Sequence, residues 1–295
     1  METALYIIIF VLIFAVGAVF ASFLNVVIYR LPRRQGFVVG SSYCPKCEHK
    51  LRSLDLVPIL SYLFLRGKCR YCHESISPRY LIIEFIGGVA AVFSYAAFLP
   101  PLALLAPQVP ELLYEGGSAV ATGLVAIWLP LDIPVAVAAA SSTVLLFALF
   151  CVLILVAFID GDTMEIPDSL NIWLAAIGFI GLVIGPFASV DWMSHLIGIF
   201  CVSLPMLILT LIIKGAFGLG DVKLIAAAGL LLGWQLTLVA AFIGILIGGF
   251  YGIYLLISKR KGRKDHFAFG PALCVGIAAS CIWGNAIIGW YAGFF

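Results

Sequence analysis

Two aspartates next to apolar stretches are the residues of this sequence best suited to chemistry. Asp221 follows Gly218 and Gly220 at the start of one apolar segment, and Asp160 closes another about sixty residues earlier. An ionisable residue that close to hydrocarbon costs several kcal/mol unless it faces a polar cavity or a partner. Two aspartates at matching depth predict a dyad that shares one proton, in which one carboxylate activates water and the other protonates a scissile carbonyl.

The residues around the two aspartates leave some roles open. Asp162 competes with Asp160 for the first position, and Asp168 is a third carboxylate of the same loop that could instead cap a helix. Gly218 and Gly220 would let an extended peptide approach Asp221 closely, since they carry no side chain. Lys223 would either support the site by stabilising an oxyanion or anchor its helix at the interface by snorkelling.

Four cysteines in two pairs form a second candidate site. Cys44 and Cys47, and then Cys69 and Cys72, make two Cys-x-x-Cys motifs separated by 21 residues. Two such knuckles supply the four thiolates of tetrahedral zinc, and we expect a structural zinc site at these residues. A pair of disulfides is the alternative, which a reducing compartment disfavours. His49 and His73 follow the pairs and could act as substitute ligands.

The elements that must position these residues are membrane helices. The chain is 63% hydrophobic and only 11% charged over 295 residues, whereas about a quarter of a soluble domain is charged. Apolar runs of roughly 20 residues recur, which is the length that crosses a bilayer as a helix. The sequence therefore predicts an all-α polytopic membrane protein of about eight transmembrane helices, near 5–29, 81–99, 142–160, 170–187, 194–213, 222–233, 236–257 and 271–293.

The distribution of charge predicts the topology. Ten of the 17 Lys and Arg lie between Arg30 and Arg79, and five more lie between Lys259 and Lys264. By the positive-inside rule these regions are cytoplasmic, whereas 100–141, which lacks Lys and Arg, is an external segment of unassigned role. We expect three parts: a first helix (1–29), a cytoplasmic zinc-binding domain (30–80) and a membrane core (81–295). The apolar stretch 112–129 is interpreted as external or re-entrant. The small net charge of +2 gives no sign of a nucleic-acid partner, and we expect none.

These features occur together with several short motifs in a fixed order. The motifs are 21–32 (Ala-Ser-Phe-Leu-Asn-Val-Val-Ile-Tyr-Arg-Leu-Pro), 55–63 and 66–69 around the knuckles, 76–80 with Glu84, 159–168, 218–223 and 269–271. With these motifs in this order, the chain resembles the bacterial type IV prepilin peptidases, which are membrane aspartic peptidases and N-methyltransferases. The lengthened segment near 100–141 departs from that pattern.

The resemblance implies specific roles. Asp160 and Asp221 would be the catalytic pair of an enzyme in the bacterial inner membrane, with the active site and zinc domain at the cytoplasmic face. Its substrates would be prepilins and pseudopilins of type IV pilus and type II secretion systems, and membrane lipid would surround it. Glu48, Asp55, Glu74 and Glu84 are candidates for attracting a basic leader. The implied methylation needs S-adenosylmethionine, but the sequence contains no glycine-rich nucleotide fingerprint, so the cofactor-binding residues are unknown.

Two other functions fit parts of the sequence. A presenilin-like intramembrane protease also uses a glycine-flanked aspartate, and Pro271-Ala272-Leu273 matches the tripeptide of that family, but Ile159 stands where that family has Tyr and no four-cysteine loop is expected there. A non-enzymatic zinc-bearing scaffold or a transporter could use buried aspartates for ion coupling. Loss of cleavage on changing either aspartate would exclude the non-enzymatic function.

Overall fold

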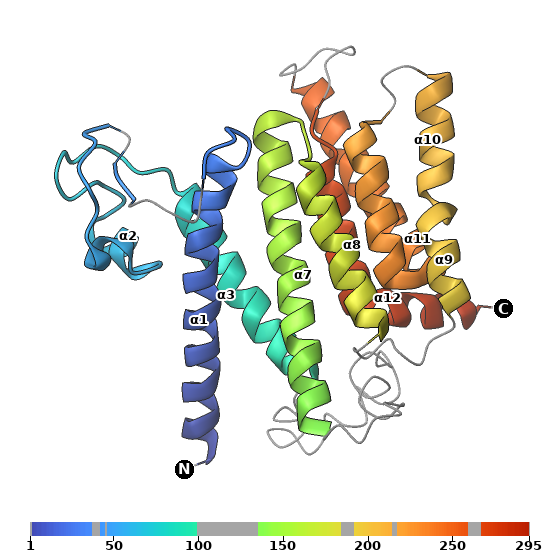
Figure 1. Ribbon diagram of the computed structural model, residues 1–295, viewed down its shortest axis with the longest axis horizontal. Coiled ribbons are helices and arrows are strands. Elements are labelled where there is room, and N and C mark those ends of the chain that lie inside the picture. Colours follow the sequence, from blue (N-terminus) through green and yellow to red (C-terminus); the bar gives the residue numbers. More distant parts are fainter. Residues whose placement is uncertain are drawn as a thin grey trace. The chain divides into compact units, whose positions relative to one another are not determined.

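The fold is helical throughout the part of the chain that the structure describes. The computed structural model describes residues 2–36, 42–44, 46–98, 135–183, 192–213, 217–258 and 267–294 (Figure 1). Its elements are α1 (Glu2–Arg30), η1 (Ser53–Leu56), α2 (Leu60–Phe64), α3 (Arg79–Phe98), α7 (Val135–Thr163), α8 (Asp168–Val183), α9 (Trp192–Cys201), α10 (Ser203–Ile212), α11 (Leu219–Ile257) and α12 (Gly270–Ala292). The described residues include two isolated β-bridges, Tyr43 with Lys50 and Lys68 with Ser75, and no strand. The predicted all-α class is confirmed.

The membrane character is also confirmed, with differences at some helix boundaries. Among the described residues, six helical stretches are long and apolar enough to cross a membrane, and α8 is a shorter apolar helix. The predicted helix 194–213 is divided at Val202 into α9 and α10. The predicted helices 222–233 and 236–257 are joined in α11, which has a non-helical residue at Gly233. The protein is therefore a multi-pass membrane protein.

The helix predicted from residue 142 begins seven residues earlier in the structure. It starts at Val135, because the run 135–141 is rich in alanine and valine and continues the apolar helix that follows. The stretch 112–129 lies outside the described residues, as do Lys214 and the basic run 259–264.

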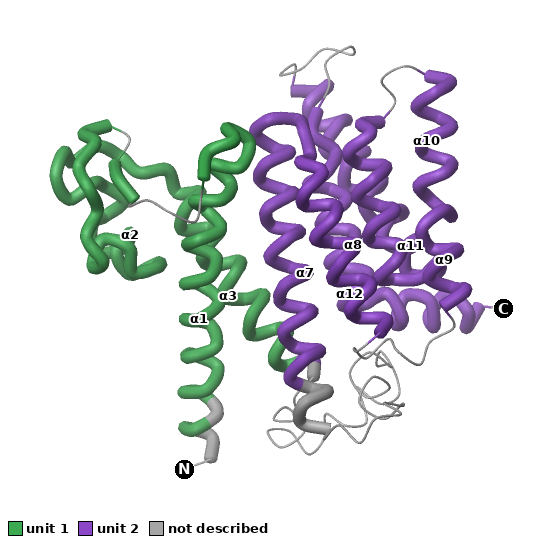
Figure 2. Tube along the Cα trace, viewed as in Figure 1, with its two compact units in different colours: residues 1–96 green, residues 97–295 purple. Residues whose placement is uncertain are grey.

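The chain forms two compact units, residues 1–96 and 97–295 (Figure 2). In the first, α1 and α3 pack antiparallel through small residues: a Cβ on Gly87 would lie 2.2 Å from the Cβ of Ala21, and the ring of Phe10 meets that of Tyr95. Small residues allow this close approach of backbones, which is how membrane helices associate without a hydrophobic driving force between them. The loop between these helices is the four-cysteine module (residues 42–78).

In the second unit, α11 is the central helix. It packs against α8, α9, α10 and α12, while α7 packs against α8 and α12. Its first half runs parallel to α8, because Gly220 faces Ile166 near the start of both helices and Leu231 faces Gly178 further along. The helix ends at Asp160 and Asp221 are thereby placed at one end of this bundle.

The break in α11 at Gly233 is stabilised by neighbouring side chains. Gly233 has φ 74° and ψ 172°, a conformation that a residue with a side chain rarely adopts. The freed carbonyls need partners, since hydrocarbon offers none. His195 Nδ1 lies 3.0 Å from the Leu230 carbonyl oxygen, and the Thr237 hydroxyl donates to the Gly233 carbonyl at 2.6 Å. The half of α11 that carries Asp221 is therefore a separate, firmly packed helix.

Candidate active site and metal centre

Asp160 lies one turn before the end of α7 and is buried, with 5% of its surface exposed. Its Oδ2 accepts a hydrogen bond from the backbone N–H of Gly270, the first residue of α12, at 2.9 Å. A Cβ on Gly270 would lie 2.6 Å from that oxygen, so only glycine permits the contact. The first N–H groups of a helix lack partners within the helix, which makes this end a natural carboxylate-binding position.

Asp221 lies in the first turn of α11 and is also buried. Its Oδ2 accepts from the N–H of Gly218 at 3.3 Å, whereas its Oδ1 is buried and has no hydrogen-bond partner. The carboxyl group of Asp160 is close enough to act on it electrostatically, and both groups act on the buried thiol of Cys274. The structure thus brings together the two aspartates predicted from the sequence.

The competing carboxylates have different surroundings. Asp162 and Asp168 are exposed, in contrast to Asp160. Asp168 begins α8 and accepts a hydrogen bond from Lys223 Nζ at 2.7 Å. This ion pair and the contact of Gly220 with Ile166 join the start of α11 to the start of α8. Lys223 therefore has an ion-pair partner at the edge of the site.

A polar residue near this end was not identified from the sequence. Asn171, in the first turn of α8, is 6% exposed, and neither its Nδ2 nor its Oδ1 has a hydrogen-bond partner. Buried polar side chains are nearly always paired, so an unpaired carboxamide is an exception that requires an explanation. An asparagine within an apolar run was the available signal, but sequence alone does not tell a buried asparagine from an exposed one.

The four cysteines of the module converge through two similar knuckles. In the first, the Glu48 N–H donates to the Cys44 carbonyl at 2.8 Å, and in the second the His73 N–H donates to the Cys69 carbonyl at 3.0 Å. Glu48 and His73 both have positive φ, 57° in each case, so each knuckle turns in the same way. All four Sγ atoms lie within 4.8 Å of one another.

The dimensions of this cluster suit a metal ion. Tetrahedral zinc with Zn–S bonds of about 2.3 Å requires sulfurs about 3.8 Å apart, and Cys44 Sγ lies 3.9 Å from Cys72 Sγ. Burial would raise the pKa of the Cys44 thiol, but hydrogen bonds from the backbone of Cys47 and Lys46 outweigh it and lower that pKa to about 7. The backbone of Glu74 lowers the pKa of the Cys72 thiol, but burial and hydrogen bonds with the other three cysteines outweigh this and raise that pKa to about 12. Without a cation the cluster therefore holds one thiolate more readily than four. His49 and His73 are not part of the cluster, and His49 instead stacks on Tyr71.

Two acidic residues of the first unit are engaged within it. The Asp55 carboxylate accepts from Arg70 Nε at 2.5 Å and from the Tyr71 hydroxyl at 3.2 Å. Burial would raise the pKa of Asp55, but these bonds and one from the Arg52 N–H hold it below its usual value. The buried Glu84 accepts from the N–H of Ile59 at 2.7 Å. Both carboxylates therefore stabilise the module itself.

Comparisons with known proteins cover nearly the whole chain. Residues 15–98 match the bacterial peptidase A24 N-terminal domain, and residues 147–253 match the type IV leader peptidase family. A prepilin leader peptidase/N-methyltransferase of Aeromonas hydrophila is 30% identical over 311 residues, covering 96% of this chain and 93% of its own. A protein of the same description from Bacillus subtilis (strain 168) is 27% identical over 281 residues, covering 95% and 96%. No solved structure matched the chain.

Proposed function

Because the chain belongs to the type IV leader peptidase family, we propose that it cleaves the short basic leader from prepilins and pilin-like secretion proteins and then methylates the new N-terminus. The observation that carries this proposal is that Asp160 and Asp221 lie near each other at one end of the helix bundle. Gly218 binds Asp221 and Gly270 binds Asp160, and the rings of the preceding residues, Phe217 and Phe269, lie 5.6 Å apart. Both aspartates come from separate helices and are buried, as two carboxyl groups that share a proton require.

The dyad supports hydrolysis of a peptide bond. One carboxylate takes a proton from water as the water oxygen attacks the scissile carbonyl carbon, and the other carboxyl group gives its proton to the carbonyl oxygen. The C–N bond of the tetrahedral intermediate then breaks, and the leaving nitrogen takes the proton that the first carboxylate accepted from water to become the new α-amine. A hydroxyl group of the intermediate returns its proton to the second carboxylate as the new carboxyl group of the leader forms. The N–H groups of Gly270 and Gly218 orient one oxygen of each carboxyl group for these transfers.

Glycines at the site suit an extended substrate. A helical peptide bond resists attack because its amide is hydrogen-bonded and shielded, so the substrate must present an unwound segment. The exposed Gly218, which has no side chain beside Asp221, would admit such a segment, whereas the absence of a side chain at Gly220 allows the close approach of Ile166. Lys223 would support the site indirectly, because its ion pair with Asp168 fixes the first turn of α11.

The second reaction transfers a methyl group from S-adenosylmethionine to the new α-amine, as the names of the relatives imply. When bound, this cofactor would supply an electrophilic methyl group for transfer to the deprotonated α-amine. Zinc at Cys44, Cys47, Cys69 and Cys72 would be structural, since four thiolates leave no position for substrate.

The topology predicted from the charges places both sites at the cytoplasmic face of the bacterial inner membrane. Lys and Arg are concentrated in the four-cysteine loop and in the run 259–264, which precedes α12. A prepilin whose apolar helix lies in the membrane would present its basic leader at that face. Membrane lipid would surround both substrate and enzyme, and we expect no nucleic-acid partner.

The test is mass spectrometry of a prepilin incubated with the purified protein and S-adenosylmethionine. We expect loss of the leader and a methyl group on the new N-terminus. Asp160→Asn and Asp221→Asn should each abolish both changes, since methylation needs the freed amine. Asp162→Asn is the matched control, because this exposed carboxylate lies two residues from Asp160.

The outcomes separate the alternative functions. Cleavage by both asparagine variants would contradict the dyad and favour a scaffold or a transporter. Cleavage of an apolar helix substrate, with the prepilin left intact, would favour a presenilin-like protease. Cleavage without methylation would retain the peptidase and remove the transferase from the proposal.

A further inference from the structure

The leucine-rich segment (residues 53–65) of the four-cysteine module has an outward surface that is almost wholly apolar. It consists of η1, α2 and the residues around them. Its exposed large side chains are Leu54, Leu56, Leu60, Leu63 and Phe64, of which Leu54 is 72% and Phe64 83% exposed. The one charged residue of the segment, Asp55, is turned inward to Arg70 and Tyr71. Contiguous exposed apolar side chains of this kind mark an interaction surface.

The position of this segment along the membrane-spanning helices indicates what covers the surface. The N–H of Ile59, which precedes α2, is bound to Glu84 of α3 at 2.7 Å. Glu84 lies five residues after Arg79, where the stretch of α3 that is long and apolar enough to cross a membrane begins, which places it about 7.5 Å along that helix. The segment is thus held beside the first turns of α3, at a depth where a membrane crossed by α3 would have lipid.

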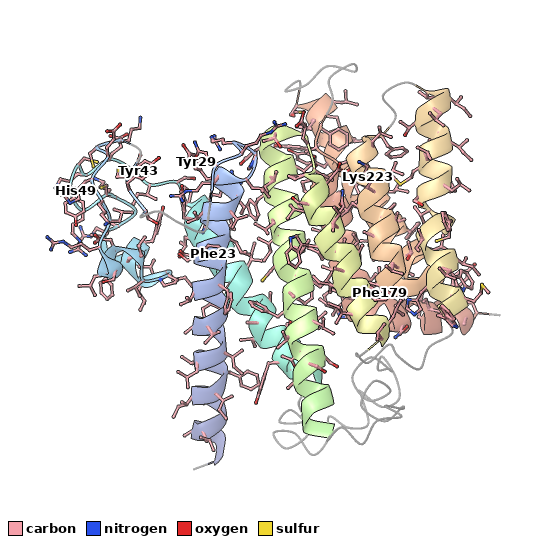
Figure 3. The ribbon with its side chains drawn as sticks, in the orientation of Figure 1. Phe23, Tyr29, Tyr43, His49, Phe179 and Lys223 are labelled. Carbon is pink, nitrogen blue, oxygen red and sulfur yellow. The ribbon has the colours of Figure 1, made fainter. Side chains whose placement is uncertain are left out.

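The figures show the same arrangement within this unit. The helix labelled α2 in Figure 1 lies level with Phe23 of α1 in Figure 3, whereas Tyr29 marks the end of that helix. Phe23 belongs to a membrane-spanning stretch that ends at Arg30. Compared with both neighbouring helices, α2 therefore lies further along the membrane-spanning stretches than the helix ends at Arg30 and Arg79.

Basic residues on both sides of the segment fit a lipid surface. Arg52 precedes it, Arg66 and Lys68 follow it, and all three side chains are exposed. An apolar face bordered by Arg and Lys is typical of a segment that lies in the membrane interface, with its apolar side chains among the acyl chains and its cations at anionic headgroups. The link to Glu84 also satisfies the Ile59 N–H where water is scarce.

We propose that the leucine-rich segment inserts into the bilayer leaflet at the end of α1 and α3 where Arg30 and Arg79 lie, and that it binds anionic phospholipid there. The four-cysteine module would then be anchored to the membrane by this segment as well as by its connections to α1 and α3. The partner is lipid and not a second protein, because the depth fixed by Glu84 leaves the outward face directed at the bilayer.

Fluorescence quenching in nanodiscs tests the proposal with the full-length, metal-loaded protein. A fluorescent amino acid replaces Phe64 in one variant and the exposed Glu74, on the second knuckle, in the control. In discs of phosphatidylcholine and phosphatidylglycerol we expect lipids with a doxyl quencher to quench position 64 several-fold more than position 74, and aqueous iodide to do the reverse. A fluorophore at Leu60 gives a second measurement if the Phe64 variant folds poorly.

Two results would overturn the proposal. Equal quenching by iodide at positions 64 and 74 would show that the segment is in water. Protection of position 64 from both quenchers would show that protein covers it, as a second copy of the chain would. Arg66→Glu should weaken lipid quenching in the phosphatidylglycerol discs, and unchanged quenching would overturn the part played by anionic headgroups.

Discussion

The aspartate pair and the cysteine cluster bring ionisable side chains together by different physical means. Asp160 and Asp221 are far apart in the chain and are brought to one end of the bundle because α7 and α11 both pack against α8 and α12. Each carboxyl group is held by a backbone N–H of a glycine. The cysteines meet through two short knuckles in a module with two isolated bridges and little helix. The first site depends on the helix bundle, whereas the second depends on what the sulfurs bind.

Removing the metal should have the largest effect on stability, and this effect should be confined to one unit. Structural zinc contributes about 10–16 kcal/mol to the folding of small zinc-finger peptides, so chelation should unfold the four-cysteine module. Hydrogen exchange at the amides of Cys69 and His73, which are bonded to Glu74 and Cys69 carbonyls, would report this loss. The amide of Gly270 should keep its protection.

A cysteine variant gives the matched control for metal removal. Cys47→Ser should release the metal, whereas Cys281→Ala, at a cysteine of α12 outside the cluster, should retain one metal ion per chain. Unchanged exchange at Cys69 after chelation would contradict the comparison, because the module would then be stable without its ligand.

Gly270→Ala should impair the dyad and leave the metal centre intact. A Cβ there would lie 2.6 Å from Asp160 Oδ2, so the carboxylate or the start of α12 must shift. Displacement of a catalytic group by about 1 Å can lower a rate about 10²-fold, and we expect a loss of this order in initial rates of leader cleavage. Gly289→Ala, in the same helix with open space at its Cβ position, is the control. Equal rates for the two variants would show that this contact does not orient Asp160.

Asn171→Leu should raise the stability of the bundle. Both polar atoms of Asn171 are buried without a partner, and an unpaired buried polar group costs about 1–3 kcal/mol. Thermal unfolding in detergent would measure the gain, and Leu174→Asn, at a fully buried position one turn further along α8, should lower stability. A loss of stability in Asn171→Leu would show that the carboxamide has a partner in the membrane, such as water.

The sequence predicts residue chemistry better than it predicts contacts between distant residues. The aspartates and cysteines were identifiable because carboxylates beside hydrocarbon and paired thiols carry their chemistry in residue type and spacing. The Gly270 N–H that binds Asp160, 110 residues away, could not be predicted in this way. The sequence predicts separate helices at 222–233 and 236–257, which agrees with the break at Gly233, but the stabilisation of that break by His195 depends on how α9 packs. Such contacts follow from tertiary packing, which no local pattern encodes.

The smallest expected effect concerns Lys223, for which the sequence left two roles open. The structure pairs it with Asp168 at an exposed position, and exposed ion pairs contribute about 0.2–1 kcal/mol. Lys223→Met and Asp168→Asn should therefore each lower stability by less than about 1 kcal/mol, and the double variant should add little, because either change alone breaks the pair. Cleavage rates should fall equally little in all three variants. An oxyanion role would instead give a large loss of cleavage in Lys223→Met and in the double variant, with Asp168→Asn close to wild type, because removing one such donor costs about 10²–10³ in rate.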